Sequence, residues 1–404
     1  MGVLRRAGPL LTLLLLLTAG SGGAQTGAET APMTIPKPEG SVRIAQYNAA
    51  LNRPGSGVLF DAILRRDAQV VATGDIIRRA APDVLLLNEF DRDAGGVALA
   101  AYTAMLAEPS LDGVPGMVYA HRYFGPSNTG VPSGLDLDGD GEAVGPGDAW
   151  GWGAFPGQYA MAVLSRFPLG PVRSWQRFPW SWVPGGLRPA LPDGRMYYED
   201  AIWRQVRLSS KSHWAVPIRL PGREITLVAG HPTPPVFDGP ENRNGRRNHD
   251  EIRLLHAIAV GADWPVDDAG QTGGIDGSFV IAGDLNADPA DGEALREALT
   301  ALLNDPRVQD PSPRSEGAIA AAEQGGANTR QAGDPAFDTA DWRDEPGPGN
   351  LRVDYVLPSA DLRLLGSGVF WPAPGAEGAH LVGRRGDKPV SSDHHLVWVD
   401  IALP

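Results

Sequence analysis

The sequence contains no cysteine among its 404 residues, and this absence excludes several kinds of chemistry. Disulfide bonds, a cysteine nucleophile and thiolate metal sites all need a thiol that the chain does not have. The stability of the protein must therefore come from a packed core and from any bound ions. A hydrophobic content of 42% and 11 tryptophans suit such a core and argue against general disorder.

Positive charge is also scarce, because 35 Lys and Arg residues stand against 48 Asp and Glu residues, for a formal net charge of -13. Tight, non-specific binding of nucleic acid normally depends on a broad basic surface, which this composition does not provide. A local basic patch remains compatible with the sequence.

Long apolar runs are missing except at the start of the chain. There a single apolar run follows Arg5 and Arg6, and a segment of small residues follows the run and ends near Ala24. This pattern at residues 1–24 is typical of a secretory signal peptide. The run is shorter than the roughly 20 residues that cross a bilayer, so a membrane anchor is the weaker interpretation. No cysteine follows it to carry a lipid, and no other segment is apolar enough to span a membrane. We therefore predict export, to a secreted or periplasmic location, after cleavage.

The exported part is predicted to start with a flexible lead at residues 25–40, which is rich in Gly, Ala, Thr and Pro. A single domain is expected at residues 41–404. Apolar runs indicate strands at 42–49, 82–90, 223–232, 278–289, 351–359 and 395–403. Helical spacing indicates helices at 57–80, 95–107, 246–260 and 291–303.

Three long stretches rich in Gly, Pro and Trp separate these elements, at about 108–158, 168–215 and 304–349. Loops of this length are uncommon in a compact domain unless they carry function, so we expect them to build the substrate surface. Their tryptophans could form an aromatic wall or could pack the loops onto the body of the domain.

Polar residues collect at the ends of the expected strands. Asp393 and His394 precede the final strand, and they reach the carboxyl ends of the other strands if that strand runs antiparallel to them. Each such residue alone could be a turn residue, a cap or a solvated strand end, but the joint pattern is harder to explain in that way. The residues that follow directly on an apolar run are Asn48, Glu89, His231, Asp284 and Asn286.

The order of these segments resembles that of a known superfamily. The stretches QYNA, LLLNEF, AGHP, AGDLNADP, RVDYVLPS and SSDHH resemble the endonuclease/exonuclease/phosphatase superfamily, the DNase I-like metal-dependent phosphoesterases. The resemblance runs from about residue 42 to residue 402, and GDLN and SDH with the upstream R-x-D-Y are its strongest parts. It implies an α/β (α+β) fold, a four-layer sandwich of two face-packed mixed β-sheets flanked by helices.

Hydrolysis of a phosphoester needs neutralised charge on the phosphoryl oxygens and a water made nucleophilic. Mg²⁺, or Mn²⁺, prefers carboxylate and amide oxygens, so Glu89 is the first candidate for a catalytic metal ligand. The resemblance adds Asn48 and Asp393 to this ligand set. It also implies that Asp284 and Asn286 position the water and a phosphoryl oxygen, around one metal ion or two.

His394 is the candidate general base, because the pKa of a free imidazole is near ~6.5. Asp354 resembles the family carboxylate that holds this ring. His395, one position further along, could be the base in place of His394 or could be a packing residue. The spacing in the family places the active imidazole directly after the aspartate, which is Asp393 here. Whether Asp284 or His394 takes the proton stays open. His231 would donate to a phosphoryl oxygen or assist the leaving group, as in the two-histidine branch of nucleases and sphingomyelinases.

Two further segments could contact the phosphate of the substrate. SSKSHW offers Lys211, and ENRNGRRN offers Arg243 and Asn244, on either side of the strand that leads to His231. Clustered cations beside a catalytic edge suit phosphate capture, whereas a solvated loop and the first turn of a helix are the structural alternatives.

The stretch LDLDGDGEAVGPGD matches the first half of a calcium loop, with Asp136, Asp138 and Asp140 at alternate positions. The twelfth position holds a glycine where a bidentate glutamate belongs, so Glu142 or Asp148 would have to substitute. A structural Ca²⁺ site and a solvated acidic turn are both compatible with this pattern.

Several functions compete at this level. The leading prediction is an exported, divalent-metal-dependent phosphoesterase, a monomer that hydrolyses phosphodiester or phosphomonoester bonds. Small esters, nucleic acid and phospholipid headgroups compete as its substrates. The alternatives are an extracellular nuclease on DNA or RNA, which the charge of -13 disfavours, and a sphingomyelinase-like lipid hydrolase, for which no amphipathic interfacial helix is evident. A non-catalytic, calcium-dependent binding module on the same fold is the rival from another class.

Overall fold

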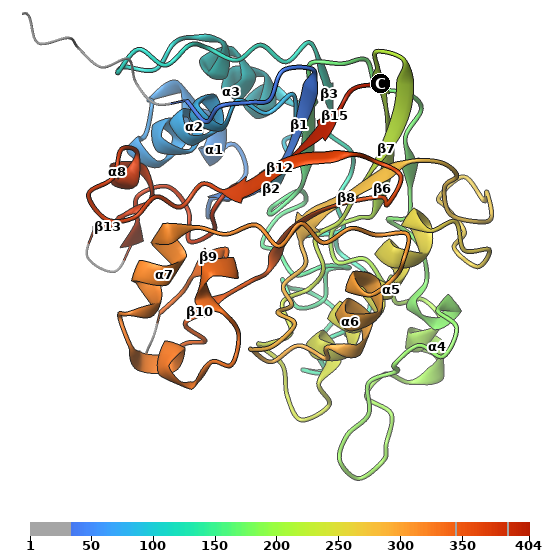
Figure 1. The fold of residues 1–404 in the computed structure, drawn as a ribbon. Coiled ribbons are helices and arrows are strands. Elements are labelled where there is room, and N and C mark those ends of the chain that lie inside the picture. Colours follow the sequence, from blue (N-terminus) through green and yellow to red (C-terminus); the bar gives the residue numbers. More distant parts are fainter. Residues whose placement is uncertain (1–33, 344–345, 386–387) are drawn as a thin grey trace, which may run out of the picture. The chain divides into compact units, whose positions relative to one another are not determined.

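The computed structural model describes residues 34–343, 346–385 and 388–404 (Figure 1). The predicted signal peptide and most of the predicted lead lie outside the described residues. The described end of that lead contacts the body of the protein: the Ile35 N–H donates to the Arg79 carbonyl at 2.8 Å, and the Arg43 guanidinium donates to the Pro36 carbonyl at 2.7 Å.

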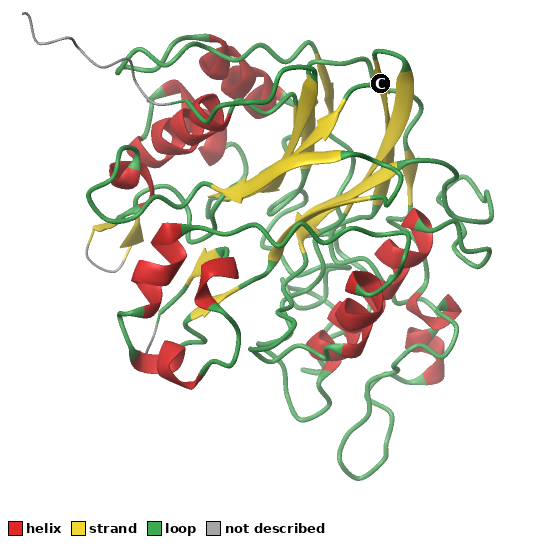
Figure 2. Cartoon of the chain, in the orientation of Figure 1, coloured by secondary structure: helices red, strands yellow, loops and turns green. Residues whose placement is uncertain are grey.

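Two large mixed sheets form the centre of the described part of the chain (Figure 2). The first sheet has the order β12 (Leu364–Val369), β15 (Val397–Ala402), β1 (Ser41–Leu51), β2 (Val84–Phe90), β4 (Ala162–Ser165), β3 (His121–Tyr123). The second has the order β11 (Asp354–Pro358), β8 (Phe279–Asp284), β7 (Arg223–Ala229), β6 (Trp214–Leu220), β5 (Arg173–Ser174). In the first sheet β1 runs parallel to β2 and antiparallel to β15, and in the second β8 runs parallel to β7 and antiparallel to β11. Two short pairs are β9 (Ala340–Asp341) with β10 (Asn350–Leu351) and β13 (Arg384–Arg385) with β14 (Lys388–Pro389).

Helices cover the outer faces of both sheets. Helices α1 to α3 lie against the first sheet, and α5 and α6 lie against the second (Figure 1). None of the helices within the described ranges is long and apolar enough to cross a membrane. The helices are α1 (Val58–Leu64), α2 (Ala68–Ala80), α3 (Val97–Ala107), α4 (Asp200–Trp203), α5 (Arg243–Ala259), α6 (Glu297–Leu303), α7 (Glu316–Ala322) and α8 (Ala379–Val382), with 3-10 turns at Trp180–Trp182, Gly326–Arg330 and Pro335–Phe337.

Alternation along the strands separates two hydrophobic cores. In β8, Val280 and Ala282 belong to the core shared with the first sheet, whereas Phe279 and Ile281 belong to the core under α5 and α6. This alternation follows from the period of two in a strand, and burial on both faces explains the nearly continuous apolar runs in the sequence. The predicted four-layer sandwich of two face-packed sheets flanked by helices is therefore confirmed.

Several element boundaries differ from the sequence predictions. The helix expected at 57–80 is divided into α1 and α2, because Arg66 between them has a left-handed φ of 57°. The helix expected at 291–303 begins only at Glu297. The strands β3, β4, β5, β6 and β12 were not predicted, since most of them are short and Pro217 interrupts the pattern of β6.

Candidate active site

The pairing of β8 with β11 creates the centre of the site. Asp284 and Asp354 are direct partners in the antiparallel register of these two strands. Asp284 continues the face of Val280 and Ala282, and Asp354 shares its face with Val356, so both carboxylates point toward the first sheet. Both side chains are almost completely inaccessible, at 1% and 0% exposure. Buried carboxylates need hydrogen bonds or a cation to remain charged.

The first sheet supplies amides to these two carboxylates. The Asn48 Nδ2 in β1 donates to Asp284 Oδ2 at 3.0 Å, and the Gln46 Nε2 donates to Asp354 Oδ1 at 2.9 Å. These two bonds join the sheets at the rim where the polar strand ends were expected to meet. Sequence reasoning did not assign a role to Gln46, although its position on the same face of the strand as Asn48 was a usable signal.

His394 lies between the two carboxylates. Its Nδ1 is 2.9 Å from Asp354 Oδ2, and its Nε2 is 3.8 Å from Asp284 Oδ2. The ring of Trp342 stands edge-on to the imidazole, with the ring centroids 5.2 Å apart. The Thr339 hydroxyl donates to the same Asp354 oxygen at 2.8 Å. Thr339 and Trp342 come from the long stretch 304–349, and no sequence signal distinguished them from its other residues.

The carboxylates control the protonation of His394. Burial alone would lower the pKa of the ring, but Asp354 and Asp284 raise the pKa of His394 well above its usual value of 6.5. Burial of Asp284 acts to raise its pKa, yet the neighbouring His394 and His231 hold the pKa of this carboxyl well below its usual range. The imidazolium form of His394 and the carboxylate form of Asp284 therefore stabilise each other.

The neighbouring His395 has a different environment. Its ring stacks on Trp371 with the centroids 3.7 Å apart, and burial together with the charge of His394 lowers the pKa of His395 well below its usual value. Neither ring nitrogen has a hydrogen-bond partner among the described residues. His395 thus occupies the position of a packing residue, and the imidazole that reaches the carboxylates is His394.

His231 and Asn286 complete the surroundings of Asp284. The His231 Nε2 is 3.4 Å from Asp284 Oδ2, and the Asn286 N–H donates to Asp284 Oδ1 at 2.9 Å. The chain does not stay extended after β8, because Asn286 has a left-handed φ of 51°, a conformation that asparagine tolerates. Its Nδ2 donates to the Pro232 carbonyl at 3.1 Å, so Asn286 ties the end of β8 to the segment that carries His231.

Glu89 and Asp393 lie at the same rim. Glu89 is half-buried near the end of β2, has a left-handed φ of 56°, and accepts a hydrogen bond from Asn52 Nδ2 at 2.8 Å. A positive φ is uncommon for glutamate, and such strain is often found at functional sites. The Ser392 hydroxyl donates to the Asn48 carbonyl at 2.7 Å, which places the half-buried Asp393 next to the end of β1.

The chemistry of this group of side chains fits a divalent cation. Asp284, Asp354 and His394 each offer one ligand atom, and within the described residues these atoms lie within 4.8 Å of one another. Asp354 already accepts hydrogen bonds from Gln46, Thr339 and His394, which suits an orienting group more than a metal ligand. The ligands expected from the sequence, Glu89, Asn48 and Asp393, also offer the carboxylate and amide oxygens that Mg²⁺ or Mn²⁺ prefers, but Glu89 and Asp393 are not members of that cluster.

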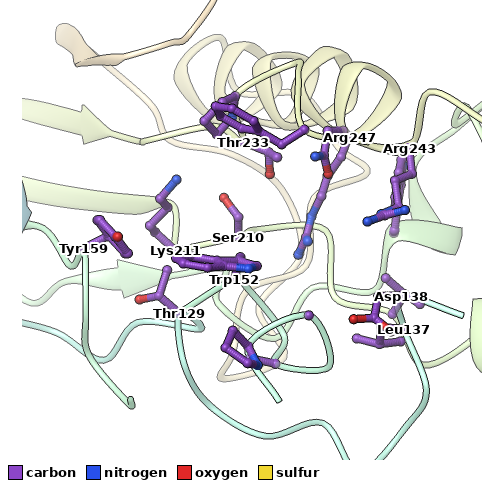
Figure 3. Close-up of a pocket in the computed structure, with 18 of the residues that line it drawn as sticks. Thr129, Leu137, Asp138, Trp152, Tyr159, Ser210, Lys211, Thr233, Arg243 and Arg247 are labelled. Carbon is purple, nitrogen blue, oxygen red and sulfur yellow. The ribbon is translucent and has the colours of Figure 1, made fainter. Parts of the chain in front are cut away.

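A pocket of about 790 Å³ opens beside Glu89 (Figure 3). Lys211 lines it and is only 7% exposed; burial lowers the pKa of Lys211, while the carboxylates of Glu251, Glu89 and Asp284 act to raise it. The stretches 108–158 and 168–215 supply much of the lining, whereas 304–349 lies beside His394 instead. The apolar and aromatic lining includes Leu137, Ala149, Trp152, Tyr159, Tyr198, Val206 and Phe237.

Arg243 and Asn244 also line the pocket, but both are engaged with the protein itself. Arg243 Nη1 donates to the Glu241 carboxylate at 2.7 Å and to the Tyr197 hydroxyl at 3.1 Å. The Asn244 Nδ2 donates to the Val236 carbonyl at 2.6 Å. Of the predicted phosphate contacts, Lys211 is the one whose charge interacts with the carboxylates of Glu89 and Asp284.

The predicted calcium loop is only partly assembled as expected. Asp136, Asp138 and Asp148 gather their carboxylates within 4.8 Å of one another. Asp140 and Glu142 are exposed and do not belong to this cluster. The sequence analysis named all three of these aspartates, and it also named Asp140 and Glu142, which stay outside the cluster.

Two face-packed mixed sheets with carboxylates, amides and histidines at one rim define a protein of the DNase I-like fold class. The sequence model of the Endonuclease/Exonuclease/phosphatase family matches residues 45–394, and the chain belongs to this family. Members of the family are hydrolases that act on phosphoester bonds. No curated protein sequence matches the chain.

Several solved structures are similar to the chain at low sequence identity. An endonuclease/exonuclease/phosphatase from Beutenbergia cavernae is 20% identical, with a TM-score of 0.47, over 90% of this chain and 72% of that one. Sphingomyelinase C from Streptomyces griseocarneus is 15% identical, with a TM-score of 0.43, over 89% of this chain and 99% of that one. A mutant beta toxin from Staphylococcus aureus, solved with bound magnesium ions, is 11% identical, with a TM-score of 0.44, over 89% of this chain and 99% of that one.

Proposed function

We propose that this chain is an exported, divalent-metal-dependent phosphoesterase that hydrolyses a phosphodiester or phosphomonoester bond of a small molecule. The observation that carries the proposal is the pocket of about 790 Å³ that adjoins Glu89 and Lys211. Pockets of roughly 300–1,000 Å³ are typical of small-molecule sites. The net charge of -13 further favours a small substrate over a long polyanion.

The side chains at the rim can divide the work of hydrolysis. A Mg²⁺ or Mn²⁺ ion held by Glu89, with Asn48 and Asp393 as further candidate ligands, would neutralise charge on the phosphoryl group. His394 accepts the proton of the attacking water at Nε2, because its Nδ1 is bonded to Asp354. Asp284 orients that water, since its Oδ2 lies 3.8 Å from His394 Nε2.

Two cationic or polar groups serve the phosphate and the leaving group. The His231 Nε2 lies 3.4 Å from Asp284 and would donate to a phosphoryl oxygen or to the departing oxygen. Lys211 at the pocket end next to Glu89 pairs with the phosphate. The organic part of the substrate then extends past Trp152 and Tyr159 into the apolar portion of the pocket.

A substrate panel tests this proposal. Chromogenic phosphomonoesters and phosphodiesters, plasmid DNA, RNA and sphingomyelin are each incubated with Mg²⁺, Mn²⁺ or a chelator. We expect metal-dependent turnover of a small ester that the chelator and His394→Ala both abolish. Faster cleavage of nucleic acid or sphingomyelin would replace the small-molecule assignment, and ligand binding without any turnover would favour a binding module.

Export is tested separately from catalysis. When the full-length chain is expressed in a bacterial host with a secretory pathway, we expect a shortened protein outside the cytoplasm whose first residue follows Ala24. Mass spectrometry of the secreted or periplasmic fraction measures this product. An uncleaved chain that stays with the membrane would support the anchor interpretation instead.

A further inference from the structure

A second group of acidic side chains lies on the loop that runs along the pocket, apart from the rim with His394. One carboxylate oxygen from each of Asp136, Asp138 and Asp148 lies within 4.8 Å of the other two. Asp148 is 1% exposed, and its Oδ1 accepts the Leu137 N–H at 2.7 Å. Its Oδ2 is also buried, and no described residue donates a hydrogen bond to it.

A buried carboxylate oxygen without a donor is costly unless a cation lies beside it. No Lys or Arg in the described part of the chain forms an ion pair with any of these three aspartates. The three groups that converge are all carboxylates, so each brings the same sign of charge to the cluster. Among the described residues no cation therefore lies within ion-pair distance of the cluster, and the nearby Arg243 is paired with Glu241 instead.

We infer that Asp136, Asp138 and Asp148 bind a Ca²⁺ ion, at a site separate from the catalytic metal. Ca²⁺ accepts about six to eight oxygen ligands in a flexible geometry, whereas Mg²⁺ demands a near-ideal octahedron. One oxygen from each of the three carboxylates, all within 4.8 Å of one another, can therefore join backbone carbonyls of the loop and water in a Ca²⁺ shell.

The departure from the usual calcium loop has a structural reason. Gly147 stands where the bidentate glutamate would be, and any side chain there would collide with the Asp138 carboxylate. The loop closes on itself at this glycine, and the next residue, Asp148, supplies the buried carboxylate. Asp140 instead accepts the Glu142 N–H at 2.8 Å and stays in solvent.

The position of the site gives the ion a role in the pocket. Leu137, Asp138 and Gly147 line the pocket, and Figure 3 shows Asp138 beside Arg243, away from Lys211. The Tyr197 hydroxyl donates to the Asp138 carbonyl at 2.6 Å and accepts from Arg243 at 3.1 Å. An ion that holds the loop therefore also holds the wall against which the organic part of a ligand packs.

Calorimetric titration of the chelator-treated full chain with CaCl2, in excess MgCl2, tests the inference. We expect one Ca²⁺ site in the wild type, and an affinity at least about tenfold weaker in Asp148→Asn and in the more accessible Asp136→Asn. Asp140→Asn is the matched control, since it removes the same charge from the same loop, and its affinity should stay within about twofold of the wild type.

Terbium luminescence provides a measurement that needs no variant. Tyr197 lies against the loop, so excitation of the protein should sensitise bound Tb³⁺, and Ca²⁺ but not Mg²⁺ should quench the signal by displacement. Absence of Ca²⁺ binding to the wild type, or an equal loss in Asp140→Asn, would overturn the assignment. Because the readout is binding, it does not depend on turnover, and His394→Ala should bind Ca²⁺ as the wild type does.

Discussion

Replacing Asp354 by asparagine tests the proposed His394–Asp354 pair. One carboxylate oxygen of Asp354 lies 2.9 Å from His394 Nδ1, and the other lies 2.9 Å from Gln46 Nε2. Because the amide nitrogen of Gln46 can only donate, the new amide must turn its oxygen toward Gln46 and its NH₂ group toward His394. The ring proton then moves to Nε2, the atom that has to accept the proton of the water.

The magnitude follows from the bond that is removed. Breaking a buried, charge-assisted hydrogen bond costs about 3 to 5 kcal/mol, and each 1.4 kcal/mol is about tenfold in rate. We therefore expect Asp354→Asn to lower kcat by roughly 10²- to 10⁴-fold. KM should change little, because Asp354 is fully buried and is not part of the pocket lining.

The pH profile gives a second readout of the same variant. Against the lowering effect of burial, Asp354 and Asp284 raise the pKa of His394. A carboxylate favours the protonated ring, so its removal lowers this pKa. Since the base must be unprotonated to act, the acidic limb of kcat/KM should move to lower pH in Asp354→Asn.

Steady-state kinetics on the best chromogenic ester between about pH 5 and 9 measure both effects. Asp338→Asn is the matched control, because Asp338 is a buried aspartate next to Thr339 that makes no contact with His394 within the described structure, and its kcat should equal that of the wild type. A kcat for Asp354→Asn within about threefold of the wild type, with an unmoved acidic limb, would refute the proposed role of the pair.

Three further predictions concern the metal, the phosphate and the stability of the fold. Glu89→Gln should need at least about tenfold more Mg²⁺ for half-maximal activity, and an unchanged Mg²⁺ titration would remove Glu89 from the ligand set. Lys211→Met should raise KM by roughly 10- to 100-fold, the cost of a charged hydrogen bond, whereas a loss confined to kcat would contradict phosphate binding by this lysine. Burial and nearby aspartates raise the pKa of Asp338 from 3.8 to about 8. Between these two pH values the folded protein holds a proton that the unfolded chain releases, so the free energy of unfolding, measured with urea, should fall as the pH rises from about 4 toward 8. In Asp338→Asn this part of the pH dependence should disappear, and an identical pH dependence in both proteins would show that Asp338 does not cause it.

The residues at the rim could be predicted because the sequence alternates apolar runs with polar ends. Asn48 and Asp284 lie toward the ends of β1 and β8 and His394 precedes β15, and the direction of the strands decides at which rim they arrive. What the sequence could not give is the register. The pairing of Asp354 with Asp284 depends on long-range packing of β8 against β11, which no local pattern encodes.

The residues that were missed share a physical cause. Gln46, Thr339 and Trp342 act on Asp354 or His394 through contacts that bridge distant parts of the chain. Thr339 lies in an irregular stretch with no periodicity, so no property of its neighbours in sequence indicates its role. The Asp-rich loop shows the same limit, because local spacing offered Asp140, Glu142 and Asp148 alike, whereas closure of the loop at Gly147 brings only Asp148 to Asp136 and Asp138.

The location of the site explains why its geometry can be held so closely. Asp284 and Asp354 continue the faces of β8 and β11 that pack Val280, Ala282 and Val356 into the core between the sheets. Their positions are therefore set by the same close packing that sets the core, and not by mobile loops. The amide bonds from Asn48 and Gln46 then act across the two sheets, so that a shift of one sheet relative to the other would break hydrogen bonds to both carboxylates at once.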